Sequence, residues 1–509
     1  MRLIVADGDM TMMEEFGSFA LSGLNLLGSL FLFAIGALVA ICLVLFVIDI
    51  TQTKSAVRRN YPVIGRFRTL FTKLGEFFRQ YFFAQDREEM PFNRAEREWV
   101  DHVSESGSDV VPFGSTKVLS PGTPIFANGL FPKLEDDEPP VPDFIIGPDT
   151  RHPYAPKSLF NISAMSYGSL SKPAIQALSK GAAKAGCYLN TGEGGVSPYH
   201  LEGGCDVVYQ IGTAKFGARN EDATLNEDKL KKICENPHIK MVEIKLSQGA
   251  KPGKGGILPA GKVNAEIAEI RGIPEGQDAI SPNRHVDAAN AEELLDLIHR
   301  VREASGRPTG IKMCIGNVKP IIMLMDAIKA RGPASAPDYI VVDGGDGGTG
   351  AAPLPLIDNT GLTARESLPL MDDLLTEYGL RDRVKLVASG KLITAADVAW
   401  AFCAGADMIN NARGFMFALG CIQALKCDQN TCPTGITTHN ARLQKGLDPT
   451  NKAVRVANYV KTIIKEVEMI AHACGVDEPR QLQREHVLIV QANGRSKPFD
   501  QVWDKSRYM

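Results

Sequence analysis

The sequence predicts an α/β protein built on a closed (β/α)8 TIM barrel, with an N-terminal transmembrane helix and a small irregular N-terminal cap. Three observations lead to this prediction. Short apolar segments alternate with amphipathic helical segments over roughly 300 residues. Glycine clusters such as "TGEGG" and "DGGDGGTG" follow several apolar segments, and a long uncharged apolar stretch lies near the N-terminus. The predicted parts are a tail (1–25), a transmembrane helix (26–49), a juxtamembrane basic and amphipathic helix (50–85), a cap or linker (86–157), the barrel (158–480) and a C-terminal tail (481–509).

The membrane helix is predicted because no charged residue occurs between Phe16 and Ile48, and about 20 apolar residues suffice to cross a bilayer. The basic n-region and small-residue cleavage site of a signal peptide are missing. A buried core helix would have more polar flanking residues. Acidic residues precede the stretch and basic ones follow it, so the positive-inside rule predicts a single-pass protein of the inner or plasma membrane with its barrel in the cytoplasm.

A second amphipathic segment follows at 64–83. Its aromatic and aliphatic residues recur at helical spacing, and Arg66, Arg68, Lys73 and Arg79 fall on the other side. This pattern predicts a helix that lies on the membrane surface. An alternative is that its aromatic face packs on the catalytic domain.

The barrel is predicted from nearly all-apolar strands, which are typical of a parallel sheet covered on both faces. The predicted strands are "LFNISAM", "VVYQI", "MVEIKLS", "TGIKMCI", "DYIVVDG", "VKLVASG" and "DMINNA", and the predicted helices include 289–304, 318–330, 394–403 and 414–425. In such barrels the chemistry lies at the carboxyl ends of the strands. Residues 86–157 show little periodicity and are Pro- and acid-rich in places, as in "LEDDEPPVPD".

Composition and one glycine motif exclude two classes of ligand. The formal net charge of −3 offers no basic excess to neutralise phosphates, so no nucleic-acid partner is expected. Gly345, Gly347 and Gly350 satisfy GxGxxG after a predicted strand, but Pro353 and Pro355 disfavour the helix that a dinucleotide site requires. The motif therefore predicts a loop around some other ligand, without a nicotinamide site.

A phosphate site is predicted where the last two strands end. "ASGK" and "NNARG" close these strands before helices, and loops after strands seven and eight of such barrels often bind phosphate. The candidates are Gly390, Lys391, Ala412 and Arg413. Ordinary turn formation is the alternative that spacing leaves open.

Three cysteines form a C-x5-C-x4-C ladder, Cys421, Cys427 and Cys432, with Pro433 after the last. Zinc sites more often show C-x2–4-C pairs and four ligands, and a cytoplasmic location disfavours a disulfide. Iron–sulfur clusters are held by cysteine thiolates, often with one Cys-Pro. Three thiols without a fourth nearby suit a [3Fe–4S] cluster; zinc and plain core residues remain the alternatives.

Four stretches together resemble the FMN domain of the glutamate synthases. These are "ISAMSYGSLSKPAIQALSKGAAKAGCYLNTGEGG", "EIKLSQGAKPGKGGILPAGKV", "DGGDGGTGAAPL" and "LGCIQALKCDQNTCPTGITT", and they follow the family's order over about residues 150–475. The resemblance implies a (β/α)8 barrel that binds FMN and one [3Fe–4S] cluster and reductively aminates 2-oxoglutarate.

The resemblance also implies roles for individual residues. The cluster ligands would be the three cysteines of the ladder. Catalysis and oxoacid binding would fall to Glu193, Gln248, Lys251 and Arg271. The cofactor-binding residues would be Ala164, Met165, Ser166, Gln248, Lys312, Gly344, Gly345, Ser389, Gly390, Lys391, Ala412 and Arg413. Arginine and lysine suit a dicarboxylate, a cation near a flavin stabilises its reduced form, and a carboxylate can move the proton of ammonia or an imine. A structural ion pair is the alternative for Glu193 and Arg271.

The sequence departs from the family at several points. No amidotransferase domain precedes the barrel and no C-terminal β-helix follows it, so ammonia or another amine is expected from solution or a partner. Ile257 stands where the family commonly has Gln, and Ser389-Gly390 replaces a glycine pair. A separate electron donor is expected: ferredoxin, a flavoprotein reductase or a membrane carrier. The rival hypotheses are N-alkylglutamate or amine oxidoreduction on the same cofactors, and a membrane-tethered electron-transfer subunit.

Overall fold

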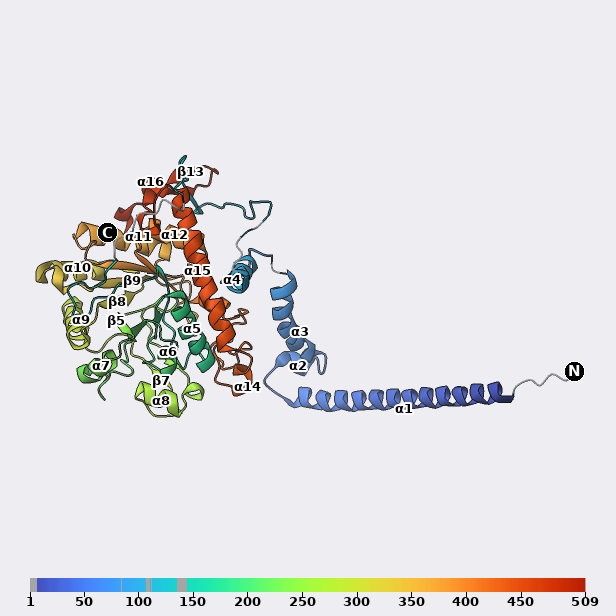
Figure 1. Cartoon of the computed structure of the whole chain (residues 1–509). Helices are drawn as coiled ribbons and strands as arrows, with labels where there is room; N and C mark the ends of the chain where they lie inside the picture. The colour runs from blue at the N-terminus through green and yellow to red at the C-terminus, as the bar shows by residue number, and fades with distance from the viewer. Residues whose placement is uncertain (1–6, 84, 107–109, 111, 135–143, 509) are drawn as a thin grey trace. The chain divides into compact units, whose positions relative to one another are not determined.

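The chain divides into two compact units, residues 1–94 and 95–509. The structure, a computed structural model, describes residues 7–83, 85–106, 110, 112–134 and 144–508 (Figure 1). Most of the predicted Pro- and acid-rich stretch at 134–143 therefore lies outside the described residues.

The second unit is built on a closed barrel of parallel strands, as predicted. The strands are hydrogen-bonded in the order β10–β11–β2–β3–β4–β5–β8–β9, and β9 pairs with β10 to close the ring. They are β2 (Phe160–Ile162), β3 (Leu189–Asn190), β4 (Val207–Ile211), β5 (Ile239–Lys245), β8 (Thr309–Met313), β9 (Tyr339–Asp343), β10 (Lys385–Ser389) and β11 (Met408–Asn411). The sequence analysis did not predict β3, because two residues are too few to show a period.

Helices surround the barrel (Figure 1). The longer ones are α5 (Lys172–Ala185), α7 (Glu227–Cys234), α9 (Ala291–Ser305), α10 (Lys319–Arg331), α11 (Ala364–Glu377), α12 (Ala395–Cys403) and α15 (Pro449–Ala473). The shorter ones are α6 (Pro198–Leu201), α8 (Ala265–Arg271), α13 (Arg413–Ala418), α14 (Ala441–Gln444) and α16 (Phe499–Val502). The helices predicted at 289–304, 318–330 and 394–403 are confirmed. No helix begins directly after the GxGxxG motif, since α11 starts only at Ala364.

The helix predicted at 414–425 is wrong in its second half, because α13 ends at Ala418. Beyond it, Gly420, Gln423 and Leu425 have φ angles of 96°, 55° and 53°. Left-handed residues cannot continue a right-handed helix. Cys421 therefore lies in a loop together with the other two cysteines of the ladder.

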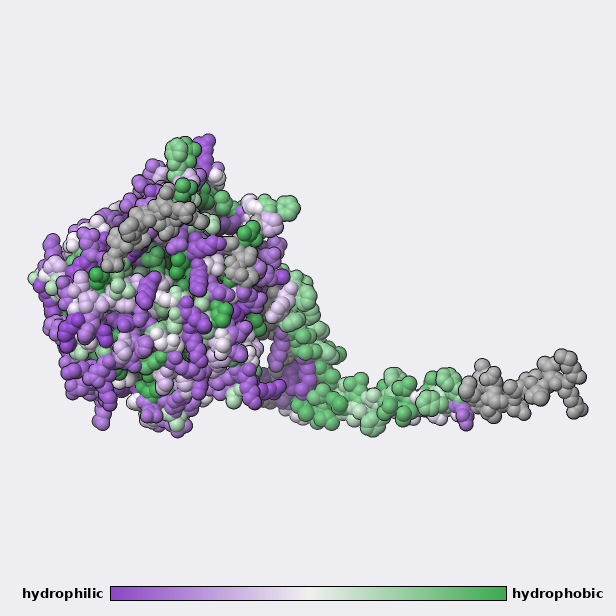
Figure 2. All heavy atoms as spheres, viewed as in Figure 1, coloured by the Kyte–Doolittle hydropathy of each residue, from purple (hydrophilic) through white to green (hydrophobic). Residues whose placement is uncertain are grey.

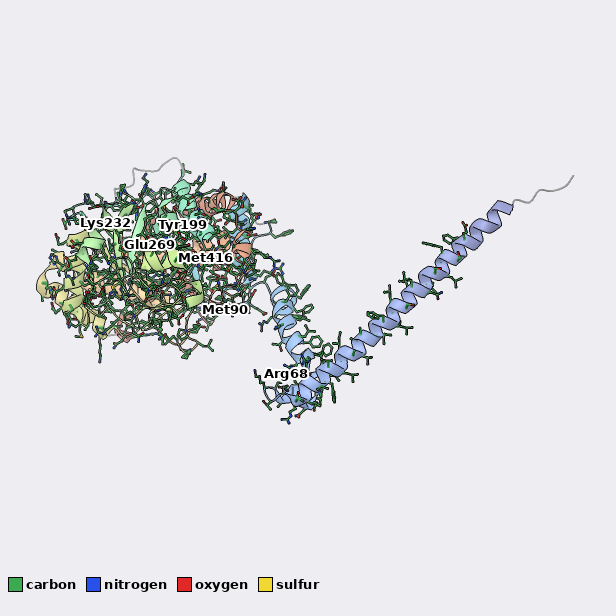
Figure 3. All side chains as sticks on the ribbon, turned by 90° about the horizontal axis from the view of Figure 1, so that it is seen from below. Arg68, Met90, Tyr199, Lys232, Glu269 and Met416 are labelled. Carbon is green, nitrogen blue, oxygen red and sulfur yellow. The ribbon has the colours of Figure 1, made fainter. Side chains whose placement is uncertain are left out.

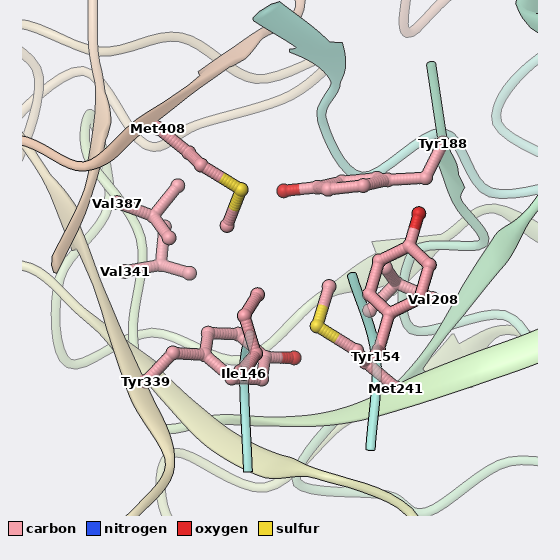
Figure 4. Close-up of a cluster of buried hydrophobic side chains, with 9 residues drawn as sticks. All are labelled: Ile146, Tyr154, Tyr188, Val208, Met241, Tyr339, Val341, Val387 and Met408. Carbon is pink, nitrogen blue, oxygen red and sulfur yellow. The ribbon is translucent and has the colours of Figure 1, made fainter. Parts of the chain in front are cut away.

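A cluster of buried apolar side chains fills the barrel interior (Figure 4). Its members are Ile146, Tyr154, Tyr188, Val208, Met241, Tyr339, Val341, Val387 and Met408. Most of the strand residues among them lie in the first half of their strands, and Tyr154 donates a hydrogen bond to Asp206, just before β4. The cluster thus closes the amino end of the barrel and leaves the carboxyl end to polar residues.

The second unit also contains segments that precede or follow the barrel in the sequence. Strands β1 (Pro124–Phe126), β12 (Val487–Val490) and β13 (Ser496–Pro498) form an antiparallel sheet. The segment predicted to be irregular also contains α4 (Arg94–Ser106), in which Asp101 and Glu105 bind Arg455 of α15. Helix α4 was not predicted, because it is a short periodic segment between long irregular ones.

The first unit consists of α1 (Asp7–Thr51), α2 (Ala56–Asn60), α3 (Gly65–Phe78) and a π-helical turn, η1 (Arg79–Phe83). The stretch Glu15–Thr51 of α1, 37 residues, is long and apolar enough to cross a membrane by length and composition. Its described residues form a green, hydrophobic rod in Figure 2. The amphipathic segment predicted at 64–83 is helical from Gly65 onward.

The packing between β8 and β9 can be tested at Gly310. A Cβ at this residue would lie 2.5 Å from ring atoms of Tyr339, a fully buried member of the interior cluster. We expect G310A to lower the free energy of unfolding by about 1–3 kcal/mol, because an overpacked core must shift backbone or side chains. Chemical denaturation measures this loss. G350A is the control, since nothing lies within 4 Å of a Cβ there, and an equal loss in both variants would contradict the packing argument.

Candidate active site

The carboxyl ends of the barrel strands carry most of the predicted site residues. Because the strands are parallel and closed into a ring, these ends form one rim. The rim and its loops bring together Ala164, Met165 and Ser166 (after β2), Glu193 (after β3), Gln248 and Lys251 (after β5), Lys312 (in β8), Gly344 and Gly345 (after β9), Ser389, Gly390 and Lys391 (at the end of β10), and Ala412 and Arg413 (after β11). Arg271 joins them from the end of α8.

Glu193 lies among three cations on this rim. Its Oε1 is 3.0 Å from Nζ of Lys245, the last residue of β5. Burial raises the pKa of Glu193, but the charges of Lys245, Lys251 and Arg271 outweigh it and bring the pKa below its ordinary 4.5. Glu193 is therefore an anion at neutral pH, and its ion pair is with Lys245.

Two glycines enclose the carboxylate of Glu193. A Cβ at Gly212, after β4, would lie 2.8 Å from Oε2, and one at Gly256 would lie 2.3 Å from Oε1. Gly256 directly precedes β6 (Ile257–Leu258), which forms a two-stranded antiparallel sheet with β7 (Ala279–Ile280). The backbone therefore contacts the carboxylate at positions where any side chain would displace it.

Arg271 is almost fully buried, with 3% of its surface exposed. Its Nη2 donates to the Tyr167 carbonyl at 3.2 Å, and its guanidinium lies 5.1 Å from the Phe216 ring centre. Nε is buried without a hydrogen-bond partner among the described residues. Burial lowers the Arg271 pKa to about 10, so it stays charged. A buried donor without a partner is costly, which makes Nε available to an anionic ligand.

Lys251 adds further positive charge to the same place and is 6% exposed. Burial and the charge of Lys245 lower its pKa, whereas Glu193 raises it. Gln248 lies half-buried on the loop between Lys245 and Lys251. Three cations against one carboxylate leave an excess of positive charge, which favours an anionic ligand.

A second ion pair joins β8 to β9. Nζ of Lys312 lies 3.3 Å from Oδ2 of Asp343, and both side chains are 7% exposed. Burial lowers the Lys312 pKa, but Asp343 and Glu243 outweigh it and shift the pKa upward. The Gly249 N–H donates to the same Oδ2 at 3.0 Å. Asp343 thereby ties the loop after β5 to the glycine loop that contains Gly344 and Gly345.

The sequence analysis did not single out Lys245, Glu243 or Asp343. Glu243 accepts hydrogen bonds from Nδ2 of Asn190 (3.1 Å) and Nε2 of Gln210 (2.5 Å), and burial raises its pKa. A signal was present: Glu243 and Lys245 stand two positions apart in the buried second half of β5. That spacing places both side chains on the same face.

The predicted phosphate-binding residues gather where β9, β10 and β11 end. Ser389 pairs with Asn410 in the β10–β11 ladder. Lys391 has a left-handed φ of 51°. Nη2 of Arg413 donates to the Asp346 carbonyl at 3.0 Å, and burial lowers the Arg413 pKa. The loop contacts join the two predicted motifs, "ASGK" and "NNARG", to the glycine loop.

The three cysteines of the ladder lie in the loop between α13 and α14, close enough for their charges to affect one another's pKa. Burial raises the Cys421 pKa to about 11. Burial also raises that of Cys432, but hydroxyl and backbone hydrogen bonds from Thr434 and Thr437 outweigh it, so its pKa falls below 9.0. Polar donors thus surround at least one thiol and favour its thiolate.

The cysteine loop is held against the barrel by a buried lysine. Lys262, 4% exposed, donates from Nζ to the carbonyls of Cys427 and Thr437, both at 2.9 Å. On the same loop, Nε2 of His439 bonds the Gly168 carbonyl at 2.8 Å. The loop therefore packs directly on the segment after β2 that contains Ala164, Met165 and Ser166.

A single metal ion and an iron–sulfur cluster require different distances between the thiols of this loop. Among the described residues, no three His, Cys, Asp or Glu side chains are arranged to hold a single metal ion. In a three-iron cluster each thiolate binds a different iron, so the thiols stand further apart than around one ion.

Comparison with known proteins decides the family. A family model described as a conserved region in glutamate synthase matches residues 131–477. The chain belongs to the glutamate synthase family. This family member is 38% identical to the glutamate synthase large subunit-like protein YerD of Bacillus subtilis (strain 168), over 92% of this chain and 96% of YerD. It is 36% identical to an archaeal glutamate synthase (NADPH) of Methanocaldococcus jannaschii, over 63% of this chain and 60% of that protein.

Solved structures similar to this glutamate synthase family member are more distant. A mutant flavocytochrome b2 with pyruvate bound is 13% identical, with a TM-score of 0.45 over 84% of this chain and 87% of that chain. A lactate oxidase of Pediococcus acidilactici is 11% identical, with a TM-score of 0.44 over 77% of this chain and 86% of that chain. The strand pairing of this chain itself defines the closed barrel.

The charge balance at Glu193 predicts a pH-dependent stability. E193Q removes the anion and leaves Lys245 buried without its ion pair. We therefore expect the free energy of unfolding to fall by roughly 3 kcal/mol at pH 7. Because the folded pKa of Glu193 lies below 4.5, wild type has this stability above pH 4.5 and loses it as pH falls through the folded pKa. The difference in free energy of unfolding between wild type and E193Q should become smaller only below about pH 4.5.

Urea denaturation at several pH values between 8 and 3 measures this difference. The control is E269Q, which removes an exposed carboxylate of the same α8 that carries Arg271 (Glu269 is labelled in Figure 3). A difference that is independent of pH, or that is matched by E269Q, would contradict the assigned charge balance.

Proposed function

We propose that this chain is a glutamate synthase-like oxidoreductase that reductively aminates 2-oxoglutarate to L-glutamate on FMN, with electrons passed through a [3Fe–4S] cluster. One observation supports it above the others. At the carboxyl ends of the barrel strands, the buried cations Lys251 and Arg271 flank the single carboxylate of Glu193. A dicarboxylate with a reacting carbonyl between its charged ends matches this arrangement of charge.

The two cations bind the two ends of the oxoacid in this proposal. Arg271 offers the unpartnered Nε, and a guanidinium binds a carboxylate through two parallel hydrogen bonds. Lys251 supplies a compact charge for the second carboxylate. Because both side chains are buried, water competes weakly with the ligand for them.

Glu193 handles protons. The overall reaction takes up ammonia, two electrons and two protons and releases water. Glu193 is ionised and held between Gly212 and Gly256, so it can accept a proton from ammonium or return one to the nitrogen of the imine. Lys245, at 3.0 Å, orients the carboxylate.

The rim residues fit a flavin. FMN, when bound, supplies two-electron reduction of the imine carbon from a cofactor that also accepts electrons one at a time. Lys312 would place a cation near the ring and stabilise its reduced form. Ala164, Met165 and Ser166 would line it through their backbone, as would Gly344 and Gly345. Ser389, Gly390, Lys391, Ala412 and Arg413 would hold the phosphate through backbone N–H groups and the guanidinium of Arg413.

Cys421, Cys427 and Cys432 would hold the [3Fe–4S] cluster. The hydroxyl donors on Cys432 and the nearby ammonium of Lys262 compensate the negative charge of thiolate ligands. Direct packing of this loop on the segment after β2 supports a short electron path to the flavin. The electron donor would be a ferredoxin, a flavoprotein reductase or a membrane carrier, reached at a membrane to which α1 anchors the chain.

One feature favours a second candidate, an amine oxidoreductase that handles N-alkylated glutamate. Ile257 follows Gly256, which contacts Glu193, and it pairs with Ile280 in the two-stranded sheet of β6 and β7. The two side chains are 44% and 61% exposed. An apolar pair on this sheet would suit the alkyl group of an amine better than ammonia.

The deciding experiment is an anaerobic half-reaction. Detergent-solubilised holoprotein is reduced with dithionite, mixed with 2-oxoglutarate and either ammonium or methylamine, and followed by flavin absorbance and product analysis. Reoxidation of the flavin by 2-oxoglutarate and ammonium, with glutamate formed, supports the synthase. Reoxidation by 2-oxoglutarate and methylamine but not by 2-oxoglutarate and ammonium, with N-methylglutamate formed, supports the second candidate. Reoxidation with neither amine, on protein that holds both cofactors, contradicts both.

Arg271 should control oxoacid binding. We expect R271A to raise the Kd of 2-oxoglutarate about 10- to 100-fold, because charged hydrogen bonds contribute roughly 1.5–3 kcal/mol. R271K should fall between R271A and wild type, since it keeps the charge and loses the fork. Titration of the flavin spectrum of oxidised protein measures each Kd. Unchanged affinity in R271A would contradict the role of Arg271. If no 2-oxoacid perturbs the flavin and electron flow is unchanged in R271A, the electron-transfer subunit is favoured.

The cysteine ladder should carry the cluster. We expect C427S and C432S, after anaerobic reconstitution, to lose bound iron and sulfide and the electron paramagnetic resonance signal of an oxidised [3Fe–4S] cluster. C403S is the matched control, because Cys403 is a buried cysteine of α12 outside the loop. Full iron content in both loop variants would show that the ladder is not the ligand set.

A further inference from the structure

The first unit contains a buried charge cluster at the end of α1. Asp49 is 0% exposed. Its Oδ1 accepts from Nε and Nη2 of Arg58 (3.0 and 2.8 Å) and from Nη2 of Arg66 (2.8 Å). Its Oδ2 accepts from Nε of Arg66 (2.8 Å) and the Val63 N–H (3.0 Å). Asp49, Arg58, Val63 and Arg66 are called the clasp below.

The clasp sets the direction in which the chain leaves α1. Its partners come from α2, from the turn after it and from α3, so the chain must fold back on the end of α1. Val63 takes a left-handed φ of 64° in that turn. At the start of α3, a Cβ on Gly65 would lie 2.9 Å from the Val57 carbonyl, so α3 begins in contact with α2.

One side of α3 and η1 is lined with exposed aromatic and aliphatic side chains, here called the aromatic face. Its members, each between 38% and 74% exposed, are Phe67, Leu70, Phe71, Leu74, Phe77, Phe78, Tyr81, Phe82 and Phe83. The rings project from the helix in Figure 3, where Arg68 is also labelled. Soluble proteins rarely expose contiguous apolar patches of this kind without a partner.

We propose that the partner is the lipid surface at the cytoplasmic end of α1, and that the clasp holds α3 with its aromatic face at the boundary between headgroups and acyl chains. The position of the clasp supports this occupant, because the clasp lies at the end of the apolar helix α1. No part of the most apolar stretch of α1 is buried by the described protein residues. An open apolar groove, lined by Leu38, Val39, Cys42, Leu43, Phe46 and Val63, connects α1 to the turn of the clasp.

Charge and side-chain type support the same occupant. Aromatic residues are enriched at membrane interfaces. Arg68, Lys73 and Arg79 leave the same helix away from the aromatic face, and basic residues near an anionic leaflet gain about 1 kcal/mol each. The clasp neutralises Asp49 at the point where the apolar helix ends, which lowers the cost of placing a carboxylate near the hydrocarbon.

The clasp also argues that α1 is retained. Removal of the apolar segment together with Asp49, as for a signal sequence, would leave Arg58, Arg66 and the Val63 N–H without the carboxylate they share. A segment that is cleaved off has no reason to form the core of the structure that follows it.

Paired tryptophan probes test the orientation of α3. F71W and T72W place the probe on adjacent residues about 100° apart around the helix, the first on the aromatic face and the second off it. Each full-length variant is reconstituted in nanodiscs of phosphatidylcholine and phosphatidylglycerol with or without brominated acyl chains. We expect F71W to lose much more fluorescence than T72W. Quenching of neither or of both equally would overturn the proposal, because the aromatic face would then lie in water or against protein.

A charge-matched pair tests the clasp itself. R58Q and R59Q each remove one positive charge from α2, but only Arg58 binds Asp49, whereas Arg59 is exposed. Combined with F71W, R58Q and also D49N should reduce the bromolipid quenching, and R59Q should leave it unchanged. Circular dichroism verifies that α3 remains helical. Equal quenching in all three would overturn the role of the clasp, and an equal decrease in R58Q and R59Q would assign the effect to charge alone.

Discussion

Closure of the parallel barrel is the constraint on which the candidate site depends. Hydrogen bonds between neighbouring strands run around the whole ring, from β9 through β10 and β11 to β2 and onward. Because all strands point the same way, every loop that follows a strand opens onto one rim. Residues separated by 249 positions, such as Ile162 at the end of β2 and Asn411 at the end of β11, thereby become neighbours on this rim. The apolar cluster at the amino end leaves only this rim for polar chemistry.

Buried charge on the rim is balanced almost pair by pair. Glu193 pairs with Lys245, and Asp343 pairs with Lys312. An unpaired buried ion costs several kcal/mol, so these pairs let ionised groups lie close together in a partly dry place. The charges of Lys251 and Arg271 are additional to these two pairs. The resulting excess of positive charge makes the site suited to an anion. Structural and functional ionic contacts are therefore parts of one network.

Much of the architecture was predictable because it follows from local patterns. Apolar strands, helical periods and glycine clusters predicted the barrel, and the apolar stretch predicted α1. The misses have physical causes: β3 is too short to show a period, and α13 stops early because Gly420 and its neighbours turn left-handed. Lys245 and Asp343 went unnoticed because each lies at the end of its strand and pairs with a residue from a different part of the sequence.

The sequence by itself determined the fold class, the family and the identity of most rim residues, since periodicity and motif order are properties of neighbours along the chain. Only the tertiary structure decided which charges pair. It joined Glu193 to Lys245 instead of Arg271, set Lys262 beneath the cysteine loop, and folded Arg58 and Arg66 back onto Asp49. Such pairings depend on distances across space, which are fixed when strands close into a ring and when loops pack on one another.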